Sequence, residues 1–511
     1  MITPRGKIES LSSFRERKRF DPGVARTLEY FDNMSHIRSQ SRHEREMGRF
    51  LVDFAKKRGF EHDKDRAGNV IMIIPATENK KNAPRLILQA HQDMVCLGKP
   101  NPAENGVRPI IDPTGKRIVA KNTTLAGDNR GGISELLALV DEPIEHGELI
   151  YIFTTAEEVG LEGAEKLNFK KYDMDYLSNN YALINVDGEK VGKVDIGSAA
   201  AGNSIIELPV KKESTKGKTL LKIVIEGGKG GHSGVDIHKK RVNAIRELAD
   251  ILQMIKMRNK LNLVSFTAGE IKDGVSVTNA ISSSAEAVIA VDKDTKSIIR
   301  SILKHQRKKI HAEYKREKKL KLSLKYKEER TNEMMDDRST KNTLDLLSQL
   351  PHGVIERVKD NPLVGKLTTK STNLAIVRTE GGKMTVQMMS RSAEDKALSE
   401  IRDNIKATAK KFSAKVKESK PYPSCSQPSD TDLFSFAKQL YEKKFGKPLK
   451  LSITHGGLEL GWWKKFWPKM PMLAIPAATI NDAHSKTESM LIGSITPAYR
   501  FLTALVEEIA R

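Results

Sequence analysis

A histidine and an aspartate separated by one residue follow an apolar run in "LILQAHQDMV", where Leu86 to Leu88 precede His91 and Asp93. The imidazole of histidine is the commonest metal ligand among side chains. A carboxylate two residues away can accept the second ring N–H of a metal-bound histidine and so fix its orientation. The alternative is a strand that reaches the surface, where polar side chains meet water. The pair alone does not decide between these two interpretations.

Further polar clusters follow in "LAGDNRGG", "TTAEEVG", "INVDG" and "NDAHS", most of them where an apolar run ends. In open α/β sheets ligands bind beyond the carboxyl ends of the strands, so side chains that are scattered along the chain can converge there. Five N and O donors are more than one zinc ion needs, and they suit two metal ions that share a carboxylate. The candidate ligands are His91, Asp128, Glu158, Asp187 and His484.

Two adjacent carboxylates, Glu157 and Glu158, stand at the end of one such run. If one of them binds metal, the other can take a proton from a metal-bound water, whose pKa falls to about 7. The chemistry that these residues indicate is metal-assisted hydrolysis.

The elements that must position these residues alternate between helical and strand patterns, which predicts an α/β fold with parallel strands and crossover helices. Strands are expected at 70–74, 86–89, 149–154 and 181–186, and helices at 24–58 and 133–140.

The pattern changes after residue 202 to lysine-rich strands and amphipathic helices, and it ends near the proline-containing stretch 418–430. The first pattern then returns, with helices at 432–445 and 496–510 and strands at 449–453 and 472–475. We therefore predict a catalytic domain made of residues 1–202 and 420–511, with a mixed, mostly parallel sheet flanked by helices. An α+β domain, residues 203–419, is inserted into it.

The net charge of +22 would favour polyanions, but aromatic residues, which stack on bases, make up only 5% of the chain. The most basic run, 304–330, has 12 Lys or Arg against 4 Glu, and it overlaps an amphipathic helix at 297–318 and an alternating strand at 320–326. Solvated faces explain this run better than nucleic-acid binding, and lysines also protect a strand edge.

Only Cys96 and Cys425 are present, which indicates a reducing compartment. The N-terminal residues lack the apolar core of a signal peptide, and no stretch approaches the roughly 18 apolar residues of a membrane-spanning helix. We expect a cytoplasmic protein with no membrane partner.

The motifs "LILQAHQDMV", "NTTLAGDNRGG", "TTAEEVGLEGA", "INVDGE", "GGKGGHSG" and "HSKTES" occur together, in this order. This set resembles that of the cytosolic metallodipeptidases of the aminoacylase and carboxypeptidase superfamily, and among them the aminoacyl-histidine (Xaa-His) dipeptidases. The resemblance spans nearly the whole chain.

The resemblance implies roles for the candidate residues. One metal ion would be held by His91 and Asp187 and the other by Glu158 and His484, with Asp128 bridging the two. Asp93 would orient His91, and Glu157 would be the general base. The resemblance also implies a cis peptide bond after Asp128.

The inserted domain would act as a ferredoxin-like lid. Within it, the resemblance implies that His232 stabilises the oxyanion and that Arg391 binds the substrate carboxylate. Asn279 is a further lid candidate. The glycine-containing loop 454–461 would line the substrate pocket, with His455 and Glu459 as candidates.

Three positions depart from glycines that are common in the related proteins, namely Asn122, Arg130 and Asp482. The first two stand near the bridging aspartate, so a bulky cation is expected beside the metals, with an effect on substrate preference.

Together these features predict a dipeptidase that acts on small peptides, Xaa-His dipeptides among them, through a metal-bridging water. Two zinc ions are expected, with manganese or cobalt as alternatives. A tripeptide aminopeptidase, an N-acyl amino acid deacylase and a non-enzymatic basic binding protein stay open. So does a homodimer, because His232 could serve its own chain or a partner.

Overall fold

The structure is a computed structural model that describes residues 9–167, 181–272, 275–326, 331–361, 364–427 and 431–511. The chain forms two units. The first comprises residues up to 198, 425–453 and 458–511, and the second comprises 199–424 and 454–457. These boundaries lie close to the predicted ones, except that 454–457, which we placed in the catalytic domain, belong to the second unit.

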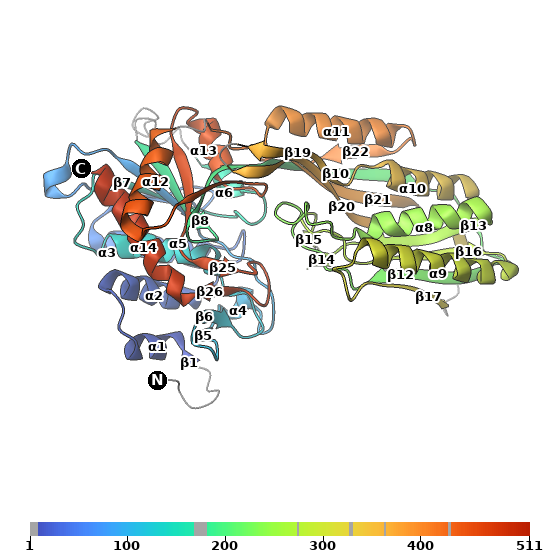
Figure 1. Cartoon of the computed structure of the whole chain (residues 1–511), viewed down its shortest axis with the longest axis horizontal. Helices are drawn as coiled ribbons and strands as arrows, with labels where there is room; N and C mark the ends of the chain where they lie inside the picture. Colours follow the sequence, from blue (N-terminus) through green and yellow to red (C-terminus); the bar gives the residue numbers. More distant parts are fainter. Residues whose placement is uncertain (1–8, 168–180, 273–274, 327–330, 362–363, 428–430) are drawn as a thin grey trace. The chain divides into compact units, whose positions relative to one another are not determined.

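The first unit contains an eight-stranded mixed sheet in the order β2-β3-β7-β4-β8-β24-β9-β23. Strands β7 and β8 of this sheet are labelled in Figure 1. The central strands β7, β4, β8 and β24 run parallel, whereas β2, β3 and β9 pair antiparallel with their neighbours. The predicted α/β fold with a mixed sheet is therefore confirmed. The strands are β2 Glu61–Lys64, β3 Val70–Ile74, β4 Leu86–His91, β7 Leu149–Thr154, β8 Ala182–Gly188, β9 Lys193–Ser198, β23 Lys450–Thr454 and β24 Met472–Pro476.

The central strands read as nearly continuous apolar runs because parallel strands are covered on both faces. Every residue of β4 and β7 is buried. A smaller sheet has the order β1-β5-β6-β26-β25. Its strands are β1 Glu9–Ser10, β5 Pro109–Ile111, β6 Arg117–Ala120, β25 Thr479–Asn481 and β26 Ser489–Leu491. The helices of the first unit are α1 Leu11–Arg17, α2 Pro22–Ser35, α3 Arg45–Arg58, α4 Pro102–Asn105, α5 Gly127–Leu139, α6 Glu162–Lys166, α12 Asp432–Phe445, α13 Leu460–Phe466 and α14 Ile492–Ile509.

The single helix predicted over 24–58 is wrong, because α2 and α3 are separated by residues 36–44. Two serines of this segment form hydrogen bonds with residues outside it. The carbonyl oxygen of Ser39 accepts the N–H of Met94 at 2.9 Å, and the hydroxyl of Ser41 donates to Asp93 at 2.7 Å. These bonds tie the non-helical segment to Asp93 and Met94, beside the candidate site.

The second unit repeats one topology twice. The first half runs β12-α8-β13-β16-α9-β17 and has the sheet order β17-β12-β16-β13. The second half contains β10, α10, β20, β21, α11 and β22, with the sheet order β20-β21-β10-β22. Each half is a ferredoxin-like βαββαβ arrangement. The predicted α+β insertion is therefore confirmed, and it contains two such arrangements.

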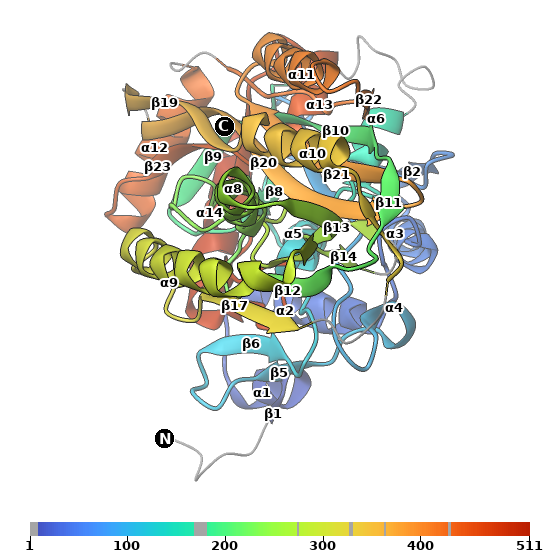
Figure 2. The same cartoon turned by 90° about the vertical axis from the view of Figure 1, so that its right-hand side faces the viewer.

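The two halves, together with β19, which pairs with β20, form one nine-stranded sheet, in which β13 pairs antiparallel with β20 through Ala268 and Val377. Helices α9, α8, α10 and α11 follow one another as a layer along this sheet (Figures 1 and 2). Strand β17, with its predicted lysines, is outermost in the strand order. The elements are β10 Ala200–Pro209, β12 Thr219–Glu226, α8 Ala244–Arg258, β13 Leu261–Ala268, β16 Ala285–Val291, α9 Lys296–Glu313, β17 Lys321–Tyr326, α10 Asp337–Gln349, β19 Gly353–Asn361, β20 Gly365–Glu380, β21 Lys383–Ser392, α11 Asp395–Lys410 and β22 Lys415–Glu418.

Among the described helices, none is long and apolar enough to cross a lipid bilayer.

Helix α5 carries a fully buried glutamate, Glu135, whose carboxyl oxygens have no hydrogen-bond partner among the described residues. Burial raises the pKa of Glu135 well above its usual range. The unfolded chain ionises this group above about pH 4.3. Because the folded state then binds more protons than the unfolded state, the stability contributed by this group falls as the pH rises above that value.

We expect Glu135→Met to raise the free energy of unfolding at pH 8 by on the order of 1–3 kcal/mol, since it removes an unsatisfied buried polar group. The gain should be smaller at pH 5. Thermal denaturation at both pH values measures the effect, and Glu135→Gln, which is polar but cannot ionise, isolates the pH-dependent part. A variant less stable than wild type at pH 8 would contradict this account.

Candidate functional site

The five side chains predicted as metal ligands come together in the first unit. His91 ends β4 and Asp187 lies near the end of β8, and these two strands are parallel neighbours. Glu158 lies in the turn after β7, which pairs with the other edge of β4. Asp128 stands at the start of α5, and His484 follows β25.

Their donor atoms form two groups that share Asp128. His91 Nε2 lies 2.9 Å from Asp128 Oδ1 and 3.4 Å from Asp187 Oδ1. His484 Nε2 lies 3.1 Å from Asp128 Oδ2 and 2.9 Å from Glu158 Oε1. In each group of three, one donor atom per residue lies within 4.8 Å of the others. The arrangement thus offers two cation positions with one carboxylate that reaches both.

The electrostatics of this cluster favour added positive charge. Burial, with Asp128 nearby, raises the pKa of Asp187 well above its usual range. Burial opposes protonation of His91, but the carboxylates of Asp187 and Asp128 raise its pKa well above the usual value. Buried carboxylates need a counter-charge. Two imidazoles and three carboxylates form a nitrogen and oxygen donor set that fits divalent zinc, cobalt or manganese.

The backbone that leads to Asp128 follows an unusual path. Ala126 has a positive φ of 64°, and the peptide bond after Asp128 is cis, as the resemblance implied. The buried carboxylate of Glu488 accepts hydrogen bonds from three N–H groups of the loop 125–127, at 2.8 to 3.4 Å. Glu488 therefore ties this loop to the segment that carries His484. No role of Glu488 was predicted from the sequence, although the motif "HSKTES" contains it.

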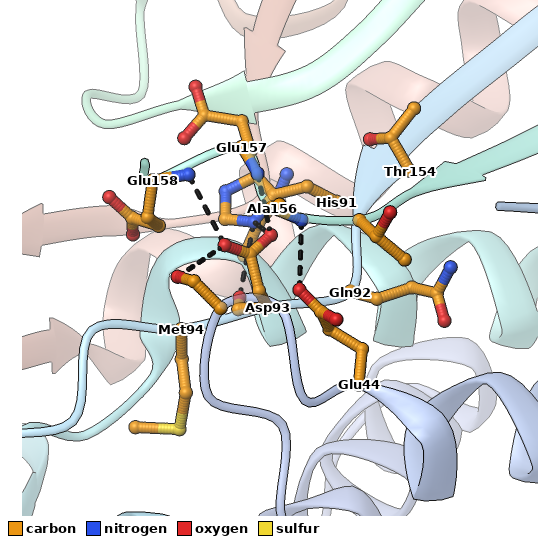
Figure 3. A network of polar contacts seen from close by, with 12 residues as sticks. Glu44, His91, Gln92, Asp93, Met94, Thr154, Ala156, Glu157 and Glu158 are labelled. Carbon is orange, nitrogen blue, oxygen red and sulfur yellow. Dashed lines mark hydrogen bonds and ion pairs between the residues drawn. The ribbon is translucent and has the colours of Figure 1, made fainter. Parts of the chain in front are cut away.

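Asp93 connects the end of β4 with the turn after β7 (Figure 3). Its Oδ1 accepts the N–H of Glu157 at 3.0 Å, and its Oδ2 accepts the N–H of Glu158 at 3.2 Å. Oδ1 also lies 3.3 Å from His91 Nδ1. One buried carboxylate thus contacts the ring of a candidate ligand and the backbone of both candidate glutamates.

Two residues from the segment between α2 and α3 support this network, and the predicted continuous helix concealed them. Ser41 Oγ donates to Asp93 Oδ2 at 2.7 Å. Glu44 Oε1 accepts the N–H of Ala156, just before the two glutamates, at 2.9 Å (Figure 3). The turn is therefore held from two sides.

Glu157 borders the cluster. One of its carboxyl oxygens lies within 4.8 Å of donor atoms of His91 and Glu158. Its side chain leaves the turn in a different direction from that of Glu158 (Figure 3). Burial, with Glu158 and Asp187 nearby, raises the pKa of Glu157 well above its usual range. A carboxylate of raised pKa suits a group that takes up a proton and returns it.

Arg130 does not lie beside the candidate ligands, so the predicted effect on substrate preference is not supported. Its guanidinium is fully buried and donates to the carbonyl oxygens of Ser35 at 2.9 Å and Ile37 at 2.6 Å, and to Ser39 Oγ at 3.1 Å. The last carbonyl groups of a helix lack partners within it. Arg130 contacts the carbonyl group of Ser35, the last residue of α2, and that of Ile37 just beyond it, and so links α5 to the end of α2.

The other two positions where the related proteins commonly have glycine, Asn122 and Asp482, have the left-handed backbone conformation that favours glycine. Asn122 has a φ of 62° and Asp482 a φ of 53°. Asparagine and aspartate adopt this left-handed conformation more readily than most residues, so both positions accommodate the substitution.

The residues predicted to bind substrate from the inserted domain lie in the second unit. Arg391, in β21, donates from Nη1 to the hydroxyl of Tyr422 at 2.9 Å, and its Nη2 lies 3.4 Å from His232 Nε2. The carbonyl oxygen of Asn279 accepts the N–H of Ser233 at 2.6 Å, next to His232. The structure therefore groups three of the predicted residues and adds Tyr422, which lies in the proline-containing stretch 418–430 and had no predicted role.

The two candidates from the loop 454–461 separate. His455 belongs to the second unit, where its Nε2 lies 2.8 Å from Ser371 Oγ. Glu459 belongs to the first unit and is fully buried, with the hydroxyl of Thr154 donating to it at 2.8 Å. Burial raises the pKa of Glu459 to about 7. Glu459 is thus an interior group and does not line an open pocket, contrary to the prediction.

We expect Asp93→Asn to weaken divalent-metal affinity by about 10- to 100-fold, the usual cost of losing a carboxylate behind a metal-binding histidine. Chelator competition with metal-loaded protein measures the affinity, and circular dichroism checks the fold. Ser41→Ala removes one hydrogen bond to Asp93 and should have a smaller effect. Equal affinities in wild type and Asp93→Asn would show that Asp93 does not orient His91.

Comparison with known proteins agrees with the motifs. Residues 214–318 match the family model of the peptidase dimerisation domain. The chain is 29% identical over 490 residues to the cytosol non-specific dipeptidase of Escherichia coli strain K12, covering 94% of this chain and 96% of that protein.

Solved structures show the same similarity. The aminoacylhistidine dipeptidase of Vibrio alginolyticus matches with a TM-score of 0.75 and 26% identity, over 95% of this chain and 96% of that chain. The aminopeptidase PepT of Bacillus cereus shares the fold, with a TM-score of 0.52 and 16% identity over 96% and 99% of the two chains. The resemblance to dipeptidases that the motifs indicated is therefore confirmed over nearly the whole chain.

Proposed function

We propose that this protein is a metal-dependent dipeptidase, and that two divalent ions are held in its first unit. His91 and Asp187 would hold one ion, Glu158 and His484 the other, and Asp128 both. The observation that carries this proposal is the division of the five donors into two groups with a shared carboxylate. Zinc suits these donors, with manganese or cobalt as alternatives.

The names of the relatives support the substrate class. The matched Escherichia coli protein is a non-specific dipeptidase and the matched Vibrio alginolyticus protein an aminoacylhistidine dipeptidase. We therefore propose dipeptides as substrates, with Xaa-His dipeptides among them. Since the Escherichia coli relative is named a cytosol enzyme, we also propose that this protein acts in the cytoplasm.

In this proposal the ions, when bound, polarise the scissile carbonyl and lower the pKa of water to about 7. Glu157 takes the proton of the attacking water and later returns it to the leaving amine. Asp93 keeps the ring of His91 in place while this proton moves. From the second unit, His232 stabilises the developing oxyanion and Arg391 binds the carboxylate of the substrate.

We also propose a homodimer, which would have to form without the edge of β13. The segment that matches the dimerisation domain includes β13, whose edge pairs with β20 of the same chain. A second copy would therefore have to use another surface. Light scattering of the purified protein gives the oligomeric state.

We expect metal-stripped protein to regain hydrolysis of Ala-His and other dipeptides when it is reloaded with Zn²⁺, Mn²⁺ or Co²⁺. A panel that adds tripeptides and N-acetyl amino acids separates the dipeptidase from an aminopeptidase or a deacylase. Activity confined to N-acetyl substrates, or no activity although two ions are bound, would contradict the proposal.

We expect Glu157→Gln to lower kcat by about 10²- to 10⁴-fold while the bound metal is retained, because general-base catalysis is typically worth that much. The matched variant Glu158→Gln, one residue away, should instead lose metal. Steady-state kinetics and elemental analysis measure the two effects. Turnover within about tenfold of wild type in metal-loaded Glu157→Gln would rule out Glu157 as the base.

A further inference from the structure

Four residues of the second unit form a row across its sheet. Ser371 of β20 stands opposite Arg391 of β21, and Arg391 stands opposite Ala201 of β10. Ala201 in turn pairs with Tyr422, with which it exchanges two backbone hydrogen bonds of 3.1 and 3.3 Å. Residues directly opposite each other in antiparallel strands point to the same face, so the four side chains share one face of the sheet.

The small side chain of Ala201 lets Arg391 and Tyr422 meet. Strands lie about 4.8 Å apart, so these two residues are separated by about 10 Å of backbone. Their long side chains close this gap above Ala201, where Arg391 Nη1 donates to the Tyr422 hydroxyl at 2.9 Å. The hydroxyl contact therefore fixes one end of the guanidinium.

The tyrosine ring is itself held in place. A Cβ built on Gly457 would lie 2.8 Å from atoms of the Tyr422 ring, so the ring packs directly against this glycine. Residue 457 belongs to the second unit, as do Tyr422 and Arg391. The ring is thus fixed between its own backbone bonds and the loop 454–457.

The guanidinium of Arg391 is buried, and its partners among the described residues are not carboxylates. Its Nε lies 3.4 Å from Ser233 Oγ, and its Nη2 lies 3.4 Å from His232 Nε2. Among the described residues of the second unit, no carboxylate lies within ion-pair distance of it. A buried cation without an anion is costly, and a carboxylate ligand would balance it.

Ser371, at the other end of the row, contacts an uncharged histidine. The Ser371 hydroxyl lies 2.8 Å from His455 Nε2. Burial and the nearby charge of Arg391 lower the pKa of His455 to about 3. His455 is therefore a neutral imidazole at physiological pH and does not compete for the anion.

We propose that Tyr422 is a positioning residue that holds Arg391 ready for a free C-terminal carboxylate, and so sets the preference of the enzyme for dipeptides over C-terminally blocked ones. This inference rests on the proposed function. Fixing the guanidinium before the substrate arrives reduces the ordering that binding must supply. Tyr422 acts through Arg391 and has no part in the chemical step.

The test compares Tyr422→Phe with wild type on a dipeptide and on the same dipeptide with a C-terminal amide. Phenylalanine keeps the ring against Gly457 and removes only the hydroxyl. We expect KM for the free dipeptide to rise about three- to tenfold, the value of one hydrogen bond, with kcat nearly unchanged. The kinetics of the amide should not change.

The matched control is Tyr314→Phe, in the same unit. It removes a hydroxyl bond of 2.7 Å to Glu247 that lies outside the row. This variant should behave as wild type with both substrates. A general loosening of the unit by either substitution would instead appear as equal changes for dipeptide and amide.

Calorimetric binding in a Glu157→Gln background gives a readout without turnover. We expect Tyr422→Phe to weaken binding of the free dipeptide by the same three- to tenfold and to leave the amide unaffected. Equal affinities with and without the hydroxyl, or equal losses for both ligands, would overturn the role of Tyr422 and leave the proposed function standing. A wild type that neither binds nor cleaves dipeptides would overturn both.

Discussion

The buried carboxylate of Asp93 links the ends of two strands that carry much of the candidate site. Strands β4 and β7 are parallel neighbours with His91 opposite Thr154, so their ends lie side by side. The turn that follows β7 is not part of the strand pairing. Asp93 fixes the position of this turn by accepting the N–H groups of Glu157 and Glu158. The position of two glutamates therefore depends on the residue that also contacts the ring of His91, and a displacement of one strand end would move all three.

Much of this arrangement could be predicted because it follows from where strands end. An apolar run that stops at a histidine or a carboxylate is visible in the sequence, and parallel strands bring such ends to one edge. The five donors lie in segments identified in this way, and the fold class followed from the same alternation of patterns. The inserted domain was visible as a change of composition. Its length, 203–419, is large for one ferredoxin-like domain and left a doubled arrangement open. The order of elements did not reveal the doubling, because the two halves are interleaved in the chain: β10 precedes the first half and its partners follow it.

The predictions that were wrong or missing concern long side chains, and segments that bond to residues far away in the sequence. Nothing local to Arg130 says that its guanidinium reaches the carbonyl groups at the end of α2 and not the neighbouring aspartate. The apolar spacing of α2 and α3 matches one continuous helix, but the segment between them bonds to residues far along the chain, as Ser41 does to Asp93. Tyr422 stands among prolines in a stretch that reads as a linker, and its partner Arg391 is 31 residues away. Contacts of this kind are set by tertiary structure and leave no periodic signal.

The doubled topology of the second unit has a consequence for how such an enzyme can change. When two identical chains pair along a strand edge, every mutation appears on both sides of the interface. Here β13 and β20 are different sequences in one chain, so each half can be altered alone. The halves carry different candidate residues, since His232 follows β12 in one and Arg391 lies on β21 in the other. A substitution that alters the surface of one half therefore leaves the other half as it was, which two identical paired chains do not allow.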